Sequence, residues 1–363
     1  MTRLQDLYDQ QGQSPWLDDL RRGWITGGDL ARWIERGVRG VTSNPTIIQK
    51  AIAGSDQYDD QFRDLARAGT PVDDAYWTMV TADIRETLRL LRPVHDESDG
   101  LDGYASVEVA PGLARDRDGT VAAARRLHEQ LAQPNLYVKV PATAEGVGAV
   151  RTLIGEGRSI NVTLIFGLDR YADVMEAYIS GLEACEGDLS RVSSVASFFV
   201  SRVDTEVDRR LDALGTDRAR ALRGRAAVAN AQVAYRMFRE TFAGPRWQAL
   251  AQRGARPQRP LWASTSTKDP TYPDTLYVDT LIGPDTVNTM PEPTLEAFED
   301  HGTVARTVDA DPAAAEGVLA DLRAAGVDLD DVARVLEDQG VAAFAKSFDE
   351  LMSSLEAKAD ALA

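Results

Sequence analysis

The stretch NLYVKVP, residues 135–141, places one lysine at the centre of a short and otherwise mostly apolar run. Successive side chains of a β-strand point to opposite faces, so Leu136, Val138 and Val140 share one face and Lys139 lies on the other. The apolar face is typical of a strand that packs against helices. Lys139 is therefore predicted to point away from the helices, into the space that the other face of the sheet encloses.

Seven further runs of this kind occur along the chain, three before and four after this stretch, separated by amphipathic stretches that are long enough for crossover helices. The eight candidate strands are residues 15–19, 40–44, 104–110, 135–141, 159–166, 192–199, 260–265 and 275–282. Alternating strands and helices predict a parallel sheet, and eight such units predict a closed (β/α)8 TIM barrel of the α/β class. Because barrels reach this length as one unit and no low-complexity linker occurs, residues 1–363 are expected to form a single domain.

Several segments exceed the simple repeat. Residues 1–13 are interpreted as a polar N-terminal stub. Residues 45–103 and 200–259 are longer than one crossover helix requires, so each is predicted to hold two or more helices. From about residue 290 to residue 363 the pattern is helical, with Asp, Glu or Pro at the predicted starts and Gly at the ends. These helices are predicted to pack on the barrel as a C-terminal extension.

Composition limits the possible partners. The formal net charge is −17, which argues against nucleic-acid and membrane-surface binding because both partners are polyanions. An anionic substrate must therefore be met by a few local cations. Cys185 is the single cysteine, which excludes a disulfide framework and fits a reducing cytoplasm. With no apolar targeting segment and no apolar stretch of membrane-spanning length, a cytoplasmic protein is expected.

The alternation test finds a polar inward face at the C-terminal ends of six consecutive runs, which is where barrels of this type place their active sites. The predicted inward residues are Asp18, Thr42, Asn44, Glu108, Lys139, Asn161, Thr163, Ser197 and Phe199, with Arg202 just beyond the sixth run. Taken singly, a helix cap or turn explains Asp18 or Asn44, and a core hydroxyl explains Thr163, about as well as a functional role. For Glu108 and Lys139 the structural alternative is a buried ion pair.

Two kinds of site are disfavoured by the residue types. The three histidines, His95, His128 and His301, fall in helical or loop stretches and are interpreted as surface residues, which argues against a Ser-His-Asp relay. Asp18 and Glu108 lack the further carboxylates or histidines that complete a metal site, and no glycine-rich phosphate loop occurs.

What remains is a lysine with two carboxylates. Burial lowers the pKa of an amine and makes it a nucleophile towards carbonyl carbon. Forming and hydrolysing an imine requires proton transfers, for which Glu108 is a candidate, together with a water held by Thr163. Asp18 is the candidate base at a neighbouring hydroxyl. The set therefore predicts class I aldolase-type chemistry, with no metal and no organic cofactor.

The stretches GVTSNPTI, LYVKVPAT, INVTLIF and SFFVSRVD, in this order and spacing, resemble the transaldolases of the pentose phosphate pathway. The resemblance covers all eight runs and extends to WLDDL, which is similar to the first strand of that family. It implies that Lys139 forms the imine, that Asp18 and not Asp19 acts at the C4 hydroxyl, that Glu108 is the strand-three glutamate and that Thr163 positions the catalytic water.

The resemblance also implies substrate contacts. Asn44 and Asn161 would bind hydroxyls of the dihydroxyacetone unit, with Thr42 beside them in the inward ring. Ser197, Phe199 and Arg202 would line the pocket, with Arg202 on the phosphate.

After strand seven the chain departs from the best-known members. The sequence ASTSTK keeps Ser264 but lacks their second phosphate-binding arginine. Lys268 is the candidate replacement, and a solvent-exposed role for Lys268 is an equal alternative. Because lysine is a point charge and arginine a fork, phosphate binding with altered geometry is expected.

Length and the segment ASTSTKDPTYPDTLYVDTLIGPDTVNTMP resemble a longer bacterial subgroup that also occurs fused to a glucose-6-phosphate isomerase. The transaldolase part alone is expected here. The resemblance implies transfer of a dihydroxyacetone unit from sedoheptulose 7-phosphate to glyceraldehyde 3-phosphate, giving erythrose 4-phosphate and fructose 6-phosphate. The alternatives are a free aldolase that releases dihydroxyacetone and, from another class, a non-catalytic barrel that binds sugar phosphates. Either a monomer or a homodimer fits the sequence.

Overall fold

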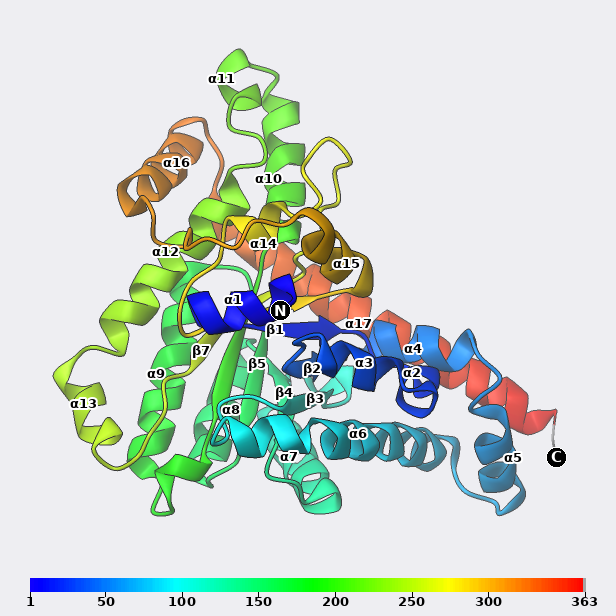
Figure 1. Cartoon of the computed structure of the whole chain (residues 1–363). Helices are drawn as coiled ribbons and strands as arrows, with labels where there is room; N and C mark the ends of the chain where they lie inside the picture. The colour runs from blue at the N-terminus through cyan, green and yellow to red at the C-terminus, as the bar shows by residue number, and fades with distance from the viewer. Residues whose placement is uncertain (362–363) are drawn as a thin grey trace.

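Eight parallel strands close into a barrel in the computed structural model, which describes residues 1–361 (Figure 1). Each strand pairs with its sequence neighbours, and β1 closes the barrel on β8. The predicted fold is therefore confirmed. The strands are β1 Gln13–Asp18, β2 Gly40–Thr42, β3 Tyr104–Glu108, β4 Leu136–Pro141, β5 Ile160–Ile165, β6 Ser194–Phe199, β7 Arg259–Ala263 and β8 Thr286–Met290.

Helices surround the barrel, and the two long segments between strands hold several each, as predicted: α4 to α6 in one and α10 to α13 in the other. The α-helices are α1 Arg3–Gln11, α2 Arg22–Gly27, α3 Asp29–Glu35, α4 Pro45–Ala53, α5 Asp59–Arg67, α6 Val72–Glu97, α7 Arg117–Leu131, α8 Ala144–Gly155, α9 Leu168–Ala184, α10 Ser201–Leu214, α11 Asp217–Arg220, α12 Ala226–Thr241, α13 Pro245–Ala251, α14 Leu276–Asp279, α15 Glu292–His301, α16 Pro312–Ala324 and α17 Leu329–Asp360. Two short 3₁₀ turns are η1 Pro111–Leu113 and η2 Leu189–Arg191.

The prediction for the eighth strand was wrong. Residues 275–282 form the short helix α14 and the turn after it, stabilised by a hydrogen bond of 2.8 Å from Thr275 Oγ1 to Asp279 Oδ2. The strand itself is β8, whose sequence TVNTM is more polar and lacked an apolar alternation to mark it. Asn288 is fully buried there and donates a hydrogen bond of 3.2 Å to the carbonyl of Tyr277. Such a bond offsets part of the cost of burying a polar strand, although Asn288 Oδ1 has no hydrogen-bond partner within the described residues.

The interpretation of residues 1–13 as a stub was also wrong. Residues 3–11 form α1, which begins with a capping box between Thr2 and Gln5 and buries Leu4 and Leu7 completely. Two apolar residues three positions apart were enough to anchor this helix because they share one face. Gln13, still within the supposed stub, already belongs to β1.

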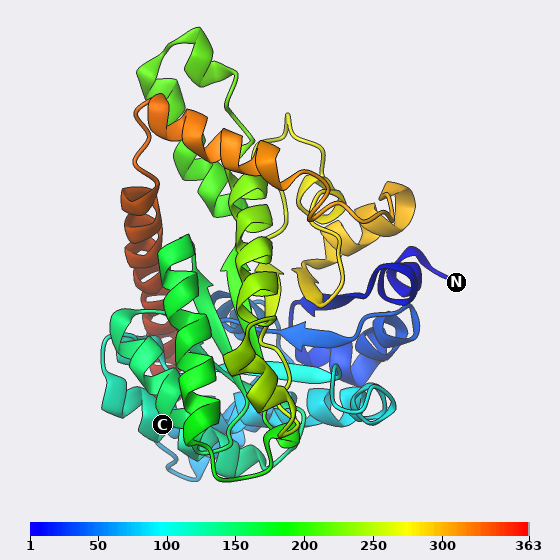
Figure 2. The same ribbon diagram turned by 90° about the vertical axis from the view of Figure 1, so that its left-hand side faces the viewer.

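The predicted C-terminal helices are confirmed as α15, α16 and α17, while residues 362–363 of the predicted extension lie outside the described part. α16 lies across α12 (Figure 2), and α17 runs beside α4, where Thr46 Oγ1 and Ser347 Oγ are 2.8 Å apart (Figure 1). Within residues 1–361, none of the helices is long and apolar enough to cross a membrane.

Large side chains fill the N-terminal half of the barrel. Trp16 and Tyr137, which by alternation share the strand faces of Asp18 and Lys139, stack with 6.1 Å between ring centroids. A Cβ atom on Gly40 would lie 2.4 Å from the Trp16 ring, so glycine is required at this close approach. Beside them the buried Asp102 and Arg259 form an ion pair of 2.9 Å. With this end filled, the open space of the barrel lies at the C-terminal ends of the strands.

Candidate active site

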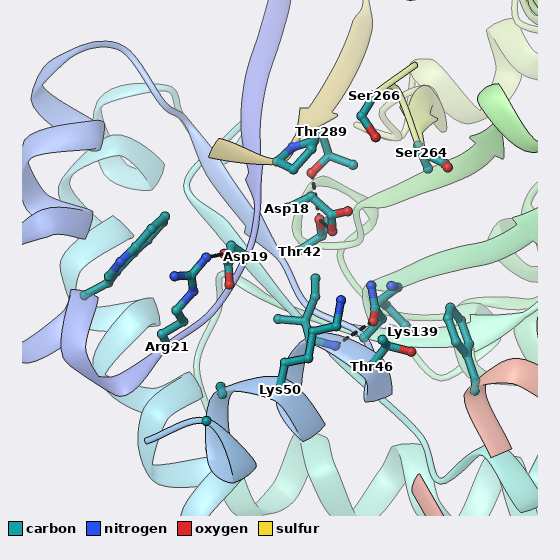
Figure 3. Close-up of a pocket in the computed structure, with 18 of the residues that line it drawn as sticks. Asp18, Asp19, Arg21, Thr42, Thr46, Lys50, Lys139, Ser264, Ser266 and Thr289 are labelled. Atoms are coloured by element: carbon teal, nitrogen blue, oxygen red, sulfur yellow. Dashed lines mark hydrogen bonds and ion pairs between the residues drawn. The ribbon is translucent and has the colours of Figure 1, made fainter. Parts of the chain in front are cut away.

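A cavity of about 670 Å³ opens at the C-terminal ends of the strands (Figure 3). Most of the predicted inward residues line it: Asp18, Thr42, Asn44, Lys139, Thr163, Ser197, Phe199, Arg202, Ser264 and Lys268. Glu108 and Asn161 are not among the lining residues, but each contacts one of them: Glu108 lies beside Lys139, and Asn161 bonds to Ser197. The strand alternation therefore located the cavity correctly, although the residues come from segments as distant as β1 and the loop after β7.

Lys139 lies in β4, and its side chain is 6% exposed. Its Nζ donates a hydrogen bond of 2.8 Å to the carbonyl oxygen of Ser43 and lies 3.5 Å from Glu108 Oε2. The buried ion pair left open by the sequence is thus present, but Lys139 also borders the cavity. Burial raises the pKa of Glu108, and the nearby Lys139 opposes this effect only partly. Glu108 is therefore suited to carry a proton.

Asp18 ends β1 and receives a hydrogen bond of 2.7 Å from Thr42 Oγ1. Thr42 Oγ1 is also 2.6 Å from Thr289 Oγ1, and because the single Thr42 hydrogen is given to Asp18, Thr289 is the donor to Thr42. Burial raises the pKa of Asp18, against the opposing effects of Lys139 and Thr42. The neighbouring Asp19 is instead paired with Arg21, as Figure 3 shows. The two aspartates therefore differ in their partners. Asp19 is neutralised by an arginine, whereas Asp18 forms no ion pair with an arginine and is influenced by the charge of Lys139.

Hydroxyl and amide groups extend the polar wall. Thr163 is fully buried in β5, and its Oγ1 has no hydrogen-bond partner within the described residues. Asn161 is also fully buried, with its amide bonded to Ser106 at 3.1 Å and to Ser197 at 2.7 Å. Asn161 therefore orients Ser197, which does reach the cavity.

Asn44 serves two purposes. Its Oδ1 accepts a hydrogen bond of 3.0 Å from the Ile47 backbone N–H, so it caps α4 as the structural alternative predicted. The same side chain borders the cavity. Because the cap uses the Oδ1 atom, the amide Nδ2 is the group left to donate towards a ligand.

Arg202 lies in the first turn of α10, half-buried in the cavity wall. Its guanidinium lies over two aromatic rings, 5.3 Å from the centroid of Phe199 and 6.0 Å from that of Phe344. Burial lowers the pKa of Arg202, and the charge of Asp18 opposes this effect only partly. No carboxylate among residues 1–361 forms an ion pair with Arg202 within 4.0 Å. It is a cation held in place by stacking and is free to meet an anion.

Lys268 joins this end of the cavity from the loop after β7, and its Nζ donates a hydrogen bond of 2.6 Å to Ser266 Oγ. Partial burial lowers its pKa, and the neighbouring Arg202 adds to this effect. The side chain is solvent-accessible, yet it is close enough to Arg202 for the two charges to interact. Ser264, whose φ of 56° is in the left-handed region, lies 2.9 Å from Ser201 through their hydroxyls.

The three histidines do not line this cavity, in agreement with the prediction of chemistry without histidine. Only His301 is exposed, however. His95 and His128 are half-buried, and burial, followed by the charge of Arg158, lowers the pKa of His128 to about 4. The interpretation of His128 as a surface residue was therefore wrong.

Many lining residues were not predicted, among them Lys50, Ser266, Thr289 and Phe344. Thr289 was missed because the eighth strand was misplaced, so the alternation test was not applied to it. Phe344 belongs to α17, and periodicity identifies its buried face but not what that face covers. Lys50 had one usable signal, since lysines are few in this chain.

A buried lysine, two carboxylates of raised pKa and a cationic end within one barrel mouth define a site for carbonyl chemistry on an anionic substrate. The family model described as Transaldolase/Fructose-6-phosphate aldolase matches residues 15–355, and the chain therefore belongs to this family.

Its relatives are transaldolases from bacteria, as the sequence resemblance predicted. The chain is 52% identical over 357 residues to the transaldolase of Parafrankia sp. (strain EAN1pec), covering 97% of this chain and 96% of the relative. It is 52% identical over 354 residues to the transaldolase of Thermobifida fusca (strain YX), covering 96% of each. It is 50% identical over 370 residues to transaldolase 2 of Streptomyces coelicolor, covering 100% of this chain and 99% of the relative.

Proposed function

We propose that this protein is a transaldolase that moves a dihydroxyacetone unit from a ketose phosphate, such as sedoheptulose 7-phosphate, to glyceraldehyde 3-phosphate. The products are erythrose 4-phosphate and fructose 6-phosphate. The observation that carries this proposal is Lys139, a buried primary amine that borders the cavity, pairs with Glu108 and shares the cavity with Asp18. Sequence relatives across the full length support the same activity.

The first half-reaction begins at Lys139. Its Nζ loses a proton, for which Glu108 at 3.5 Å is the nearest carboxylate, and adds to the C2 carbonyl carbon of the ketose. Loss of one water gives a protonated imine. Glu108 Oε2 lies 3.5 Å from Lys139 Nζ but forms no hydrogen bond within the described residues, and neither does Thr163 Oγ1, so both buried oxygens are available to bind that water and pass its protons.

Carbon–carbon cleavage uses Asp18. Its carboxylate takes the proton of the C4 hydroxyl while the C3–C4 bond breaks, the aldose leaves, and the bonding electrons remain on an enamine at Lys139. The acceptor aldehyde then forms a new bond to this enamine, and Asp18 returns the proton to the new hydroxyl. Hydrolysis of the imine releases the product ketose. The protonated imine serves as the electron sink, so the sequence of steps uses no metal and no organic cofactor.

The remaining lining residues bind the substrate. Asn44 Nδ2 donates to a hydroxyl of the three-carbon unit, and Ser197 Oγ, whose own hydrogen is given to Asn161, accepts from another, while Thr42 holds Asp18. Arg202 and Lys268 bind the phosphate, near Ser264 and against Phe199.

An assay without acceptor tests the transferase against a free aldolase. Glu108 and Phe199 favour the transferase, because aldolases of this family tend to carry glutamine and a pocket tyrosine instead. With fructose 6-phosphate alone, we expect little steady-state release of dihydroxyacetone, and addition of erythrose 4-phosphate should restore turnover. Rapid release of free dihydroxyacetone without acceptor would show that the protein is an aldolase.

We further propose that the chain acts as one barrel domain, in the cytoplasm, as a monomer or homodimer. The family match across residues 15–355 supports one domain, and the free, buried Cys185 fits a reducing compartment.

A further inference from the structure

The pairing of the five lysines is uneven. Three have a carboxylate partner: Lys139 with Glu108 at 3.5 Å, Lys346 with Glu350 at 3.8 Å and Lys358 with Asp59 at 2.8 Å. Lys50 and Lys268 form no ion pair within 4.0 Å among residues 1–361. Both of these unpaired lysines line the same cavity.

Lys50 lies in the last turn of α4, the helix that Asn44 caps. Figure 3 shows its side chain extending from this helix into the cavity, on the same side as Thr46 and Lys139. Although the residue is exposed, its amine is close enough to Lys268 to oppose the charge of that lysine. Lys50, Arg202 and Lys268 therefore form one group of cations, contributed by α4, α10 and the loop after β7.

This cation group is unusual for an acidic protein. The net charge is −17, so carboxylates are plentiful, and the two arginines at the other end of the cavity are already engaged, Arg21 by Asp19 and Arg22 by Asp83. Asp18 is the one carboxylate whose charge acts on both Arg202 and Lys268, and it forms no ion pair with either within 4.0 Å among residues 1–361. Three cations with a single carboxylate near them repel one another and weaken the fold unless an anion binds between them. The arrangement therefore indicates a polyanionic group on the ligand, and a phosphate monoester has the charge and the acceptor oxygens to meet three cations.

We propose that Lys50 is a third phosphate-binding residue, and that it and Lys268 together replace the second arginine that the sequence lacks. This inference rests on the proposed transaldolase function. A lysine on a flexible stem acts as a point charge, so two lysines on separate elements can contact different oxygens of one phosphate. The consequence is specificity: Lys50 favours phosphorylated aldehydes over neutral ones.

The test is the acceptor specificity of Lys50→Gln. The mechanism is of the ping-pong type, so kcat/KM for the acceptor reports only the second half-reaction and is independent of donor binding. We expect kcat/KM for glyceraldehyde 3-phosphate to fall roughly ten- to hundredfold, the loss of one charged hydrogen bond, while kcat/KM for unphosphorylated glyceraldehyde changes less than about threefold. Lys50→Arg should recover most of the loss. Lys346→Gln, which removes a lysine outside the cavity, is the matched control and should behave like the parent protein.

Titration calorimetry with inorganic phosphate gives a readout that does not depend on turnover. Phosphate should bind Lys50→Gln at least about tenfold more weakly than the parent protein. An equal loss with both acceptors, or unchanged phosphate affinity, would overturn the role of Lys50. Failure of the transaldolase function would look different, because the parent protein itself would then show no transfer between sugar phosphates.

Discussion

At the scale of single residues, the site separates two carboxylates by their surroundings. Glu108 is buried, and its Oε2 faces Lys139 at 3.5 Å without a hydrogen bond from any described residue, whereas Asp18 is held by a chain of hydroxyls from Thr289 through Thr42. The pKa of each is raised by burial. The first is therefore suited to proton transfers at the imine, and the second to the substrate hydroxyl.

Thr42→Val should shift the pH profile of cleavage. Asp18 accepts a proton only when ionised, and the hydrogen bond from Thr42 stabilises the ionised form. Without that donor the pKa of Asp18 rises further, so the acid limb of kcat/KM for fructose 6-phosphate should move to higher pH, with less than about a tenfold change on the plateau.

Thr271→Val is the control for this experiment, because Thr271 also donates to an aspartate, Asp269, at 2.7 Å but lies outside the cavity. It should leave the profile unchanged. If the acid limb of Thr42→Val stays in place, Asp18 is not the group that controls it.

At the scale of secondary-structure elements, the C-terminal helix α17 completes a site built mostly on the barrel. Phe344 stacks on Arg202, and Gly340 lets the helix approach β5, since its Cβ would lie 2.9 Å from Leu164 Cδ2. Leu164 itself has a φ of 59° at an irregularity in the β5 to β6 register. α17 therefore packs against Arg202, the arginine proposed to bind the phosphate.

Gly340→Leu should disturb both the packing and the phosphate end. The added side chain meets Leu164 and comes within reach of Arg202 Nη1, which lies 3.7 Å from the ideal Cβ position. We expect a loss of about 1–3 kcal/mol in the free energy of unfolding, as for other overpacked sites, and a raised KM for phosphorylated substrates. Urea denaturation and steady-state kinetics measure these effects.

The matched control is Gly317→Leu in α16, where nothing lies within 4 Å of the added Cβ. This change should not lower the stability, because leucine favours a helix more than glycine does. Equal effects at both positions would show that the contact between α17 and the barrel determines neither the stability nor the KM for phosphorylated substrates.

Prediction from the sequence succeeded where a pattern is local. Period-two alternation identified Lys139, Asp18 and Thr163 as inward, because a strand fixes the direction of each side chain. It failed for β8, where the buried Asn288 donates to the Tyr277 carbonyl, a partner that a strand pattern cannot reveal. It also missed Phe344, because helical periodicity gives a buried face without saying what it covers.

At the scale of the whole molecule, the two ends of the barrel differ in structure and in role. The C-terminal end holds the cavity, and the N-terminal end holds a buried network around Asp102. This aspartate accepts hydrogen bonds from Ser14, Trp16, Arg39 and Arg259. Burial alone would raise the pKa of Asp102, but Arg259 and Arg39 outweigh it, and the pKa is lowered. The closed barrel could be predicted by counting strands, whereas this network joins residues too distant in sequence to be paired from it.

Asp102→Asn should destabilise the protein by roughly 3–5 kcal/mol, because it leaves Arg259 buried without its counter-ion. The contribution of Asp102 is present above the pKa of an ordinary aspartate and is lost as the pH falls through its lowered pKa in the folded protein. The difference in urea stability between parent and variant should therefore be largest near neutral pH and shrink in acid.

Asp60→Asn is the control, since Asp60 forms an ion pair with Arg63 but its side chain is 92% exposed. Loss of this ion pair should lower the free energy of unfolding by no more than about 1 kcal/mol. A similarly small effect for Asp102→Asn would show that the network does not stabilise the barrel.

The most direct test of the central claim is borohydride reduction in the presence of fructose 6-phosphate, followed by mass spectrometry of peptides. We predict a ketose-derived adduct on Lys139 and none on Lys139→Met, which should stay folded because methionine fills the same space without charge. An unfolded Lys139→Met would instead favour a purely structural ion pair with Glu108. An adduct on another lysine, or no adduct on the parent protein, would contradict the imine mechanism.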